Sequence, residues 1–113
     1  MNYEIIATKT FRKKVKALSK KYHSLKNDLD EFEKELLANP EMGDSIGGNV
    51  RKVRMAISSK NKGKSGGARV IICNFLVDFD NTDIYLLTIY DKNEQETISS
   101  FEIENIKKES NLF

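Results

Sequence analysis

Lys52 and Arg54 are the side chains whose types and spacing point most directly to chemistry. They alternate with the apolar residues Val53, Met55 and Ile57, and this two-residue period is typical of a half-buried strand. Both cations should therefore point to one side of the strand, about 6–7 Å apart after two strand rises. A pair of cations on one surface is suited to binding phosphate groups.

A basic, glycine-rich loop follows at residues 58–67 and leads to Arg69. Glycine lets the backbone approach a phosphate and turn its N–H groups toward it, and Arg69 can offer its guanidinium to two phosphate oxygens. Part of a P-loop motif is present, but Ser58 replaces its first glycine and a strand should follow the loop, so we expect no triphosphate site. The loop residues that matter are Lys60, Lys62, Gly63, Lys64, Gly66 and Gly67.

Two tyrosines could add rings for base stacking. Tyr90 ends an apolar run and precedes Asp91-Lys92, which predicts exposure, whereas Tyr85 is expected in the core. The only histidine, His23, falls at a predicted helix–helix turn, and without a cysteine cluster we expect no zinc site, no other metal and no cofactor. The residues therefore predict that single-stranded RNA, or an RNA backbone, binds a cationic sheet face.

Charge is strongly segregated along the chain, although the net charge is only +2. None of the 17 acidic residues lies between Asp44 and Asp78, and that interval carries seven cations. A second acid-free stretch, residues 5–27, carries eight cations, whereas residues 28–44 and 78–113 are acidic. Such a chain can hold a polyanion on one surface while staying near neutral overall.

Length and composition favour a single domain spanning residues 1–113, with 39% hydrophobic and 32% charged residues. No apolar run approaches the length of a membrane span, and the first residues do not have the pattern of a secretory signal. One cysteine, Cys73, lies in an apolar run. We therefore expect a cytoplasmic protein with no membrane partner.

The elements that must position these side chains can be read from periodicity. A strand is expected at residues 3–8, followed by two amphipathic helices that break at His23-Ser24 and end at Asn39-Pro40. Glycines then mark a loop at residues 43–48, and strands follow at 52–57, 70–77 and 84–90, the last two joined by an Asp- and Asn-rich turn at 78–83. Ser99 and Glu102 can form a capping box before a helix at 100–110. The order β-α-α-β-β-β-α predicts an α+β fold with helices on one face of a small, mostly antiparallel sheet and the other face free for a ligand.

Three stretches of the chain resemble the RelE/ParE superfamily of bacterial toxins from type II toxin–antitoxin systems. The resemblance is closest to the HigB-like branch of RelE-type mRNA interferases. It rests on residues 11–18 (FRKKVKAL), on residues 51–56 (RKVRMA) with 63–70 (GKSGGARV), and on residues 84–92 (IYLLTIYDK).

The resemblance implies a toxin that enters the ribosomal decoding site, cleaves mRNA there, and is inhibited by an antitoxin encoded beside it, expected to be a helix-turn-helix protein. It also implies that Lys52 and Arg54 correspond to the basic positions of the second strand and Arg69 to the arginine of the third strand. Lys92 then corresponds to the cation that follows the fourth strand. One position departs from the family pattern. Relatives of the RelE type have a tyrosine several residues after that cation, whereas this sequence has Ile98 near the corresponding position.

RNA cleavage without a metal needs a base, charge stabilisation at phosphorus and an acid. We therefore hypothesise that Lys52, Lys60 or Lys64 is the base, because neighbouring cations disfavour the charged form of a lysine. Arg69 would stabilise the transition state, and Lys92 or Tyr90 would act as the acid or orient the substrate. The RNA would contact Arg51, Arg54, Lys62, Gly66 and Gly67.

Two alternatives stay open at this stage. A ParE-like gyrase inhibitor shares the scaffold, but it would act through protein contacts rather than through a dense cationic face. A non-catalytic module would use the same patch only to bind RNA or an acidic antitoxin.

Overall fold

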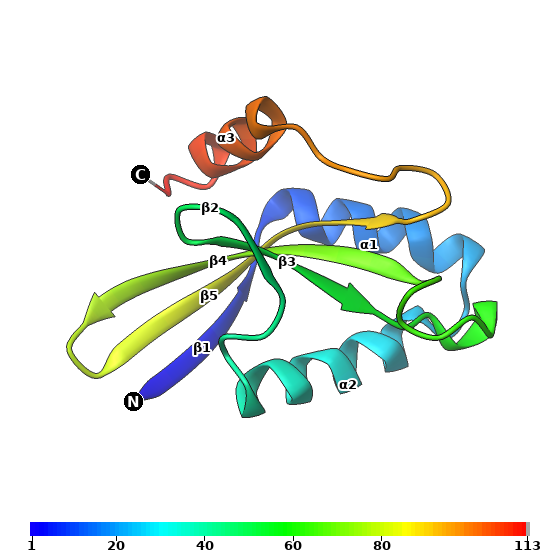
Figure 1. Ribbon diagram of the computed structural model, residues 1–113, viewed down its shortest axis with the longest axis horizontal. Helices are drawn as coiled ribbons and strands as arrows, with labels where there is room; N and C mark the ends of the chain where they lie inside the picture. The colour runs from blue at the N-terminus through cyan, green and yellow to red at the C-terminus, as the bar shows by residue number, and fades with distance from the viewer. Residues whose placement is uncertain (113) are drawn as a thin grey trace.

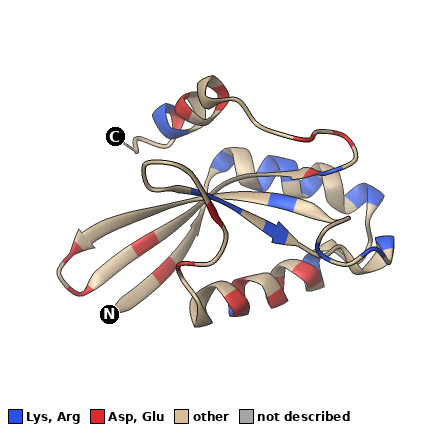
Figure 2. Cartoon of the chain, viewed as in Figure 1, with Lys and Arg blue, Asp and Glu red and all other residues tan. Residues whose placement is uncertain are grey.

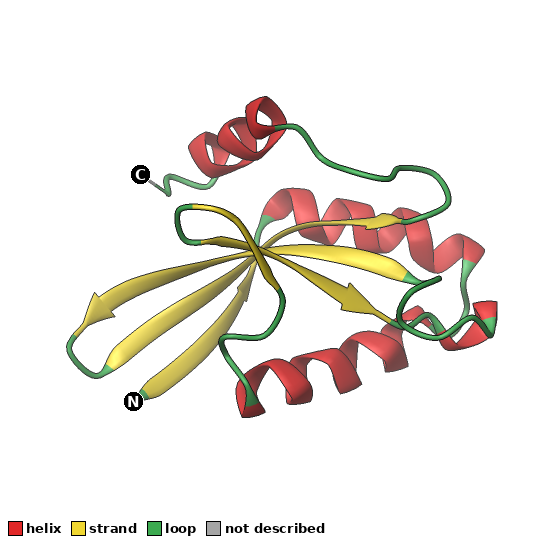
Figure 3. Ribbon diagram, in the orientation of Figure 1, coloured by secondary structure: helices red, strands yellow, loops and turns green. Residues whose placement is uncertain are grey.

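A five-stranded sheet forms the centre of the computed structural model, which describes residues 1–112 (Figures 1 and 3). The strand order is β1-β5-β4-β3-β2, with β1 parallel to β5 and every other pair antiparallel. The strands are β1 (Asn2–Ala7), β2 (Asp44–Gly47), β3 (Val50–Met55), β4 (Ala68–Asp78) and β5 (Asn81–Asp91). The predicted α+β fold with a mostly antiparallel sheet is confirmed.

A helical hairpin covers one face of the sheet. It consists of α1 (Lys9–Lys21) and α2 (Leu25–Ala38), which pack their apolar stripes against β3, β4 and β5. Thr8 fixes the start of α1, since its Oγ1 accepts a hydrogen bond from the Phe11 N–H and also donates to the Leu87 carbonyl. The predicted break at His23-Ser24 and the end of the second helix before Pro40 are both confirmed.

The glycine-rich segment after α2 contains a short strand that the sequence did not reveal. β2 is only four residues long and its side chains are exposed, so it carries no alternating apolar signal. Gly47 and Gly48 have φ values of +125° and +55°, which allow the tight turn from β2 into β3. The predicted loop at residues 43–48 is therefore an edge hairpin.

A third helix covers part of the opposite sheet face, so the expectation that this face is free was wrong. α3 (Ser100–Glu109) starts at Ser99, whose hydroxyl accepts the Glu102 N–H at 3.1 Å. Ile103 and Ile106 pack there against β3, β4 and β5 in a second apolar cluster. The cluster members are Val50, Ile71, Cys73, Leu87, Tyr90, Ile98, Ile103, Ile106 and Leu112.

The long β4–β5 hairpin extends beyond the helices at one end of the molecule (Figure 1). Its turn consists of Phe79 and Asp80, and Asp78 Oδ1 accepts the Asp80 N–H at 2.9 Å. The acidic segment is thus a hairpin turn, as predicted, but the turn is shorter than the predicted residues 78–83 because both strands extend into that range. The molecule measures 40 × 30 × 22 Å, and within residues 1–112 no helix is both long and apolar enough to cross a bilayer.

Candidate nucleic-acid interface

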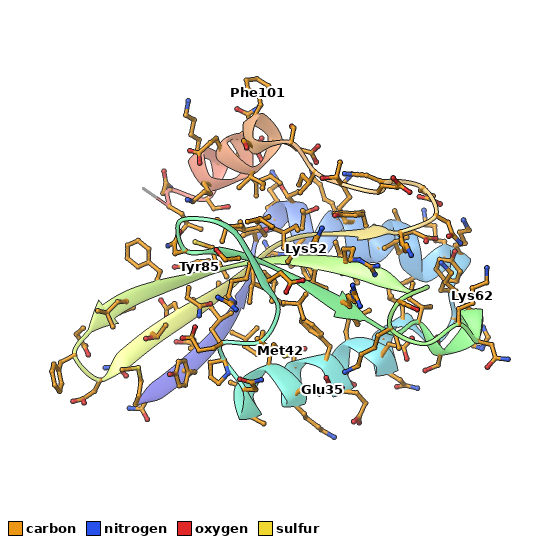
Figure 4. The ribbon with its side chains drawn as sticks, viewed as in Figure 1. Glu35, Met42, Lys52, Lys62, Tyr85 and Phe101 are labelled. Atoms are coloured by element: carbon orange, nitrogen blue, oxygen red, sulfur yellow. The ribbon has the colours of Figure 1, made fainter. Side chains whose placement is uncertain are left out.

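Three side chains form a row across neighbouring strands. Arg54 of β3 is directly opposite Arg69 of β4, and Arg69 is directly opposite Tyr90 of β5. Directly opposed side chains have Cβ atoms about 4.5–5.5 Å apart. Lys52 lies two residues before Arg54 and therefore on the same face, opposite Ile71 (Figure 4). The structure thus brings together Lys52, Arg54, Arg69 and Tyr90 on the face that α3 covers only in part.

Arg69 is buried, with 7% of its surface exposed, and its guanidinium holds the returning loop. Nη1 donates to the carbonyls of Lys64 and Ala68, and Nη2 donates to the carbonyl of Ser65 at 3.1 Å. No carboxylate among residues 1–112 forms an ion pair with it. Its charge therefore stays uncompensated beside Arg54, an arrangement that costs stability because like charges stand opposite each other.

Tyr90 differs from its predicted exposure, because α3 and the segment before it cover the ring. The side chain is 7% exposed, and its hydroxyl has no hydrogen-bond partner among residues 1–112. Burial raises the pKa of Tyr90, and the nearby Arg69 charge opposes that shift. Tyr90 therefore keeps its proton at neutral pH and offers a hydrogen-bond donor. A buried ring cannot serve as the stacking platform that the sequence suggested.

Lys64 shares an open hollow with two cations of β3, the half-buried Lys52 and the exposed Arg54. The hollow has a volume of about 330 Å³ and is lined by Lys52, Arg54, Lys64 and Asp44 among others. Lys64 Nζ also forms an ion pair with Glu35 of α2 at 2.8 Å, in which both side chains are about half exposed. Such a surface pair contributes little energy, so Lys64 remains free to exchange Glu35 for a phosphate.

The loop glycines make room for the protein's own atoms. A Cβ at Gly67 would lie 2.1 Å from the Met55 carbonyl oxygen, and one at Gly66 would lie 2.5 Å from Cβ of Lys62. Only Gly63, with φ +65°, needs the left-handed backbone region. Lys62 itself is exposed at the end of the molecule (Figure 4). Close packing therefore explains Gly66 and Gly67 without any contact with RNA.

Lys60 lies on the other face of the sheet, away from the Arg54–Arg69–Tyr90 row. Its Nζ forms a 2.8 Å ion pair with Asp91, and both side chains are buried, at 5% and 0% exposure. The Tyr22 hydroxyl donates to the second oxygen of the same carboxylate. Burial raises the pKa of Asp91, but hydrogen bonds from Lys60, Tyr22 and the Asn93 N–H outweigh it, so the net shift is downward.

Arg51 likewise points away from the row. Arg51, Val53 and Met55 alternate along β3 and therefore point to the same sheet face. The Arg51 guanidinium donates to the carbonyls of Met42 and Gly43 at 3.0 and 2.7 Å. Arg51 therefore holds the connection between α2 and β2. Because Arg51 directly precedes Lys52 in a strand, the sequence already indicated that the two side chains point to opposite faces.

The sequence did not single out Asp28, which anchors the start of the basic loop. Its carboxylate accepts the Ser58 N–H, the Ser58 hydroxyl and the Ser24 hydroxyl, although the residue lies on α2. The 3-10 turn η1 (Ser58–Lys60) is thereby tied to the helical hairpin. Asp28 and Asp91 thus fix one end of the loop, and Arg69 fixes the other.

Lys92 and Tyr85 lie at the margins of the site. The Lys92 N–H donates to the Gly67 carbonyl at 3.1 Å, which places the exposed Lys92 beside the end of the loop. Tyr85 is partly buried against the α3 cluster, on the same sheet face but far along β5 from Tyr90. Its predicted core position is therefore borne out in part.

Metal ligands are not grouped at this surface. Within residues 1–112, no set of three or more His, Cys, Asp and Glu side chains is placed to hold a metal ion. The chemistry available to the row is thus that of two guanidinium groups, a neutral phenol and neighbouring lysines.

Comparison with known families identifies the family of the chain. The family model described as the RelE toxin of the RelE/RelB toxin–antitoxin system matches residues 3–113, nearly the whole chain. The resemblance noted from residues 11–18, 51–70 and 84–92 is confirmed at the level of this family, which implies an antitoxin partner. The chain belongs to the RelE toxin family of toxin–antitoxin systems.

Proposed function

We propose that this RelE-family toxin is a metal-independent endoribonuclease that cleaves mRNA on the ribosome and thereby arrests translation. The observation that carries the proposal is the Arg54–Arg69–Tyr90 row with Lys52 beside it on one sheet face. The match over residues 3–113 supports a single toxin domain. The HigB-like subtype and the cytoplasmic location are parts of the same proposal.

The row is suited to an RNA backbone because no carboxylate of residues 1–112 neutralises its charges. Among residues 1–112, neither Lys52 nor Arg54 forms an ion pair. Arg69 is held rigidly by three carbonyls. A phosphate bound beside Arg54 would relieve the repulsion between Arg54 and Arg69.

The reaction that fits is attack of a ribose 2′-oxygen on the adjacent phosphorus. Lys52 is the group that takes the 2′-hydroxyl proton, and a 2′-O–P bond forms as the P–O5′ bond breaks. Arg54 and Arg69 stabilise the extra negative charge on the phosphoryl oxygens. Tyr90 stays buried opposite Arg69 and helps to position it, and Lys92 gives a proton to the leaving 5′-oxygen. The products are a 2′,3′-cyclic phosphate and a 5′-hydroxyl.

Lys60 has no part in this scheme, because it lies on the other sheet face in a buried ion pair. Arg51 has none either, because its side chain lies on the other face of β3 from Lys52 and Arg54 and donates there to the carbonyls of Met42 and Gly43. Lys64 and Lys62 contribute positive charge along the path of the strand. The ribosome supplies alignment of the 2′-oxygen, worth several kcal/mol.

The test is primer extension on an mRNA translated in vitro with the purified toxin. Wild type should produce new 5′ ends within the translated region. Lys52→Arg keeps a long basic side chain, but a guanidinium cannot give up its proton to act as a base, so we expect cleavage to fall about 100-fold or more with RNA binding retained. Arg54→Ala should weaken both, whereas Lys108→Ala on α3 serves as the matched cation control.

Arg69→Ala should also abolish cleavage, but it removes the hydrogen bonds to the loop and must be paired with a thermal melt. Full cleavage by Lys52→Arg would remove Lys52 as the base. A wild-type toxin that binds ribosomes without making new 5′ ends would leave only a binding module. Double-strand DNA breaks with intact mRNA would indicate gyrase inhibition instead.

A further inference from the structure

The free end of the β4–β5 hairpin carries an exposed apolar surface. Phe79 is 90% exposed and Leu76 63%, and Phe75, Val77 and Met1 are exposed beside them. In Figure 1 this end of the sheet lies beyond α2 and α3. An exposed group of large apolar side chains on a small protein commonly marks a surface that binds a partner.

The apolar side chains project from both faces of the hairpin as well as from its turn. Phe75 is opposite Asp83 and lies on the α3 side, whereas Leu76 is opposite Thr82 and lies on the helical-hairpin side. A partner could therefore wrap around the hairpin end.

One edge of β4 is also open at this end. Pairing with β3 stops at Cys73, and the edge is closed at Asn74, whose N–H donates to the Asn49 carbonyl. Beyond that point no strand among residues 1–112 pairs with β4 on this side. Its remaining backbone groups are available to an extended segment of another protein.

Acidic residues surround the apolar surface. They are Glu4, Asp78, Asp80 and Asp83, and the chain has no lysine or arginine between Arg69 and Lys92. Hydrogen bonds from the Asp80 N–H and from Asn81 lower the pKa of Asp78, so its carboxylate is charged at neutral pH. Figure 2 shows acids at this end of the sheet and cations on β3, on α1 and in the loop. This surface repels RNA and anionic lipid, and it attracts cations.

We propose that the hairpin end is a docking surface for a protein segment that combines apolar side chains with flanking lysines or arginines. The apolar part would cover Phe79, Leu76 and their neighbours, and the flanking cations would meet the acidic residues. This proposal is independent of RNA cleavage, since the surface shares no residue with the Arg54–Arg69–Tyr90 row.

The test uses two labelled peptides with the same leucine and phenylalanine residues, one flanked by lysines and the other by glutamates. Their binding to the full chain is followed by fluorescence anisotropy. We expect the lysine-flanked peptide to bind and Phe79→Ser or Leu76→Ser to weaken it about tenfold or more, because exposed aromatic and aliphatic anchors dominate such contacts. Phe101→Ser is the matched control, since Phe101 is 77% exposed on α3.

Charge is tested separately. The double change Asp80→Asn with Asp83→Asn should weaken the lysine-flanked peptide several-fold at low salt, whereas Glu31→Gln on α2 should have no effect. The proposal is overturned if the lysine-flanked peptide does not bind at about 1 mM. Equal binding of the glutamate-flanked peptide, or an equal loss with Phe101→Ser, would overturn it too. Phe79-dependent binding to phosphatidylcholine/phosphatidylglycerol vesicles would replace it with a membrane surface.

Discussion

The buried Lys60–Asp91 ion pair gives the sharpest stability prediction. Lys60→Met keeps the length of the side chain but leaves the Asp91 carboxylate buried without its main partner. Removing one member of a buried pair typically costs about 3–5 kcal/mol. We expect the lower end, about 3 kcal/mol, because the Tyr22 hydroxyl and the Asn93 N–H still donate to Asp91.

That loss of unfolding free energy should lower the melting temperature of a chain of 113 residues by a large amount. With an unfolding entropy of about 2.1 cal/mol/K per residue, 3 kcal/mol lowers the melting temperature by about 13 °C. Lys62→Met, an exposed lysine in the same loop, should change stability by no more than about 0.5 kcal/mol. The assay is circular dichroism melting with urea titration of both variants.

A second substitution tests whether the ion pair itself is responsible. Asp91→Asn in the Lys60→Met background removes the buried charge, for which only the half-exposed Lys21 remains as an ion-pair partner at 3.8 Å, and should recover much of the lost stability. If Lys60→Met melts within about 2 °C of Lys62→Met, or if Asp91→Asn destabilises both backgrounds equally, the pair does not hold the loop as argued.

Three further predictions follow from single contacts. Because the folded pKa of Asp91 lies below the usual 3.8, its stabilisation is present at neutral pH and lost as the pH falls through that folded value; urea titrations below pH 4 should show a steeper loss in wild type than in Asp91→Asn. Gly67→Ala places a Cβ 2.1 Å from the Met55 carbonyl oxygen and should cost about 1–3 kcal/mol in chemical denaturation. Ser99→Ala removes the cap of α3 and should cost about 1 kcal/mol, with faster amide exchange in α3 as the specific readout.

Most of the sheet and the helical hairpin could be predicted from periodicity, because their apolar patterns are long. Thr8, the break at His23-Ser24 and Pro40 then fixed the helix boundaries locally. β2 could not be predicted in the same way, since four exposed residues show no period. The amphipathic pattern of α3 shows that it buries one side but not which sheet face it covers.

The site was predictable where strand alternation decides the direction of a side chain, and less so in the loop. Alternation placed Lys52 and Arg54 on one face and would have placed Arg51 on the other. Lys60 looked like its neighbours Lys62 and Lys64, because a loop has no period and the partner Asp91 is 31 residues away in sequence. Tyr90 is buried because α3 and the segment before it pack on its ring. This contact is between residues far apart in the strand pattern, so the local sequence around Tyr90 does not indicate it.

The separation of charge explains how one small chain can face two kinds of partner. The basic loop and the acidic hairpin end lie toward opposite ends of a molecule 40 Å long (Figure 1). The Debye length in physiological salt is about 8 Å, so the acids at the hairpin hardly weaken the positive field at the Arg54–Arg69–Tyr90 row, where we propose that RNA binds. The same screening keeps the cations from masking the hairpin acids. A net charge of +2 is therefore a poor guide to either surface, and each should keep its own salt dependence when the other is neutralised by mutation.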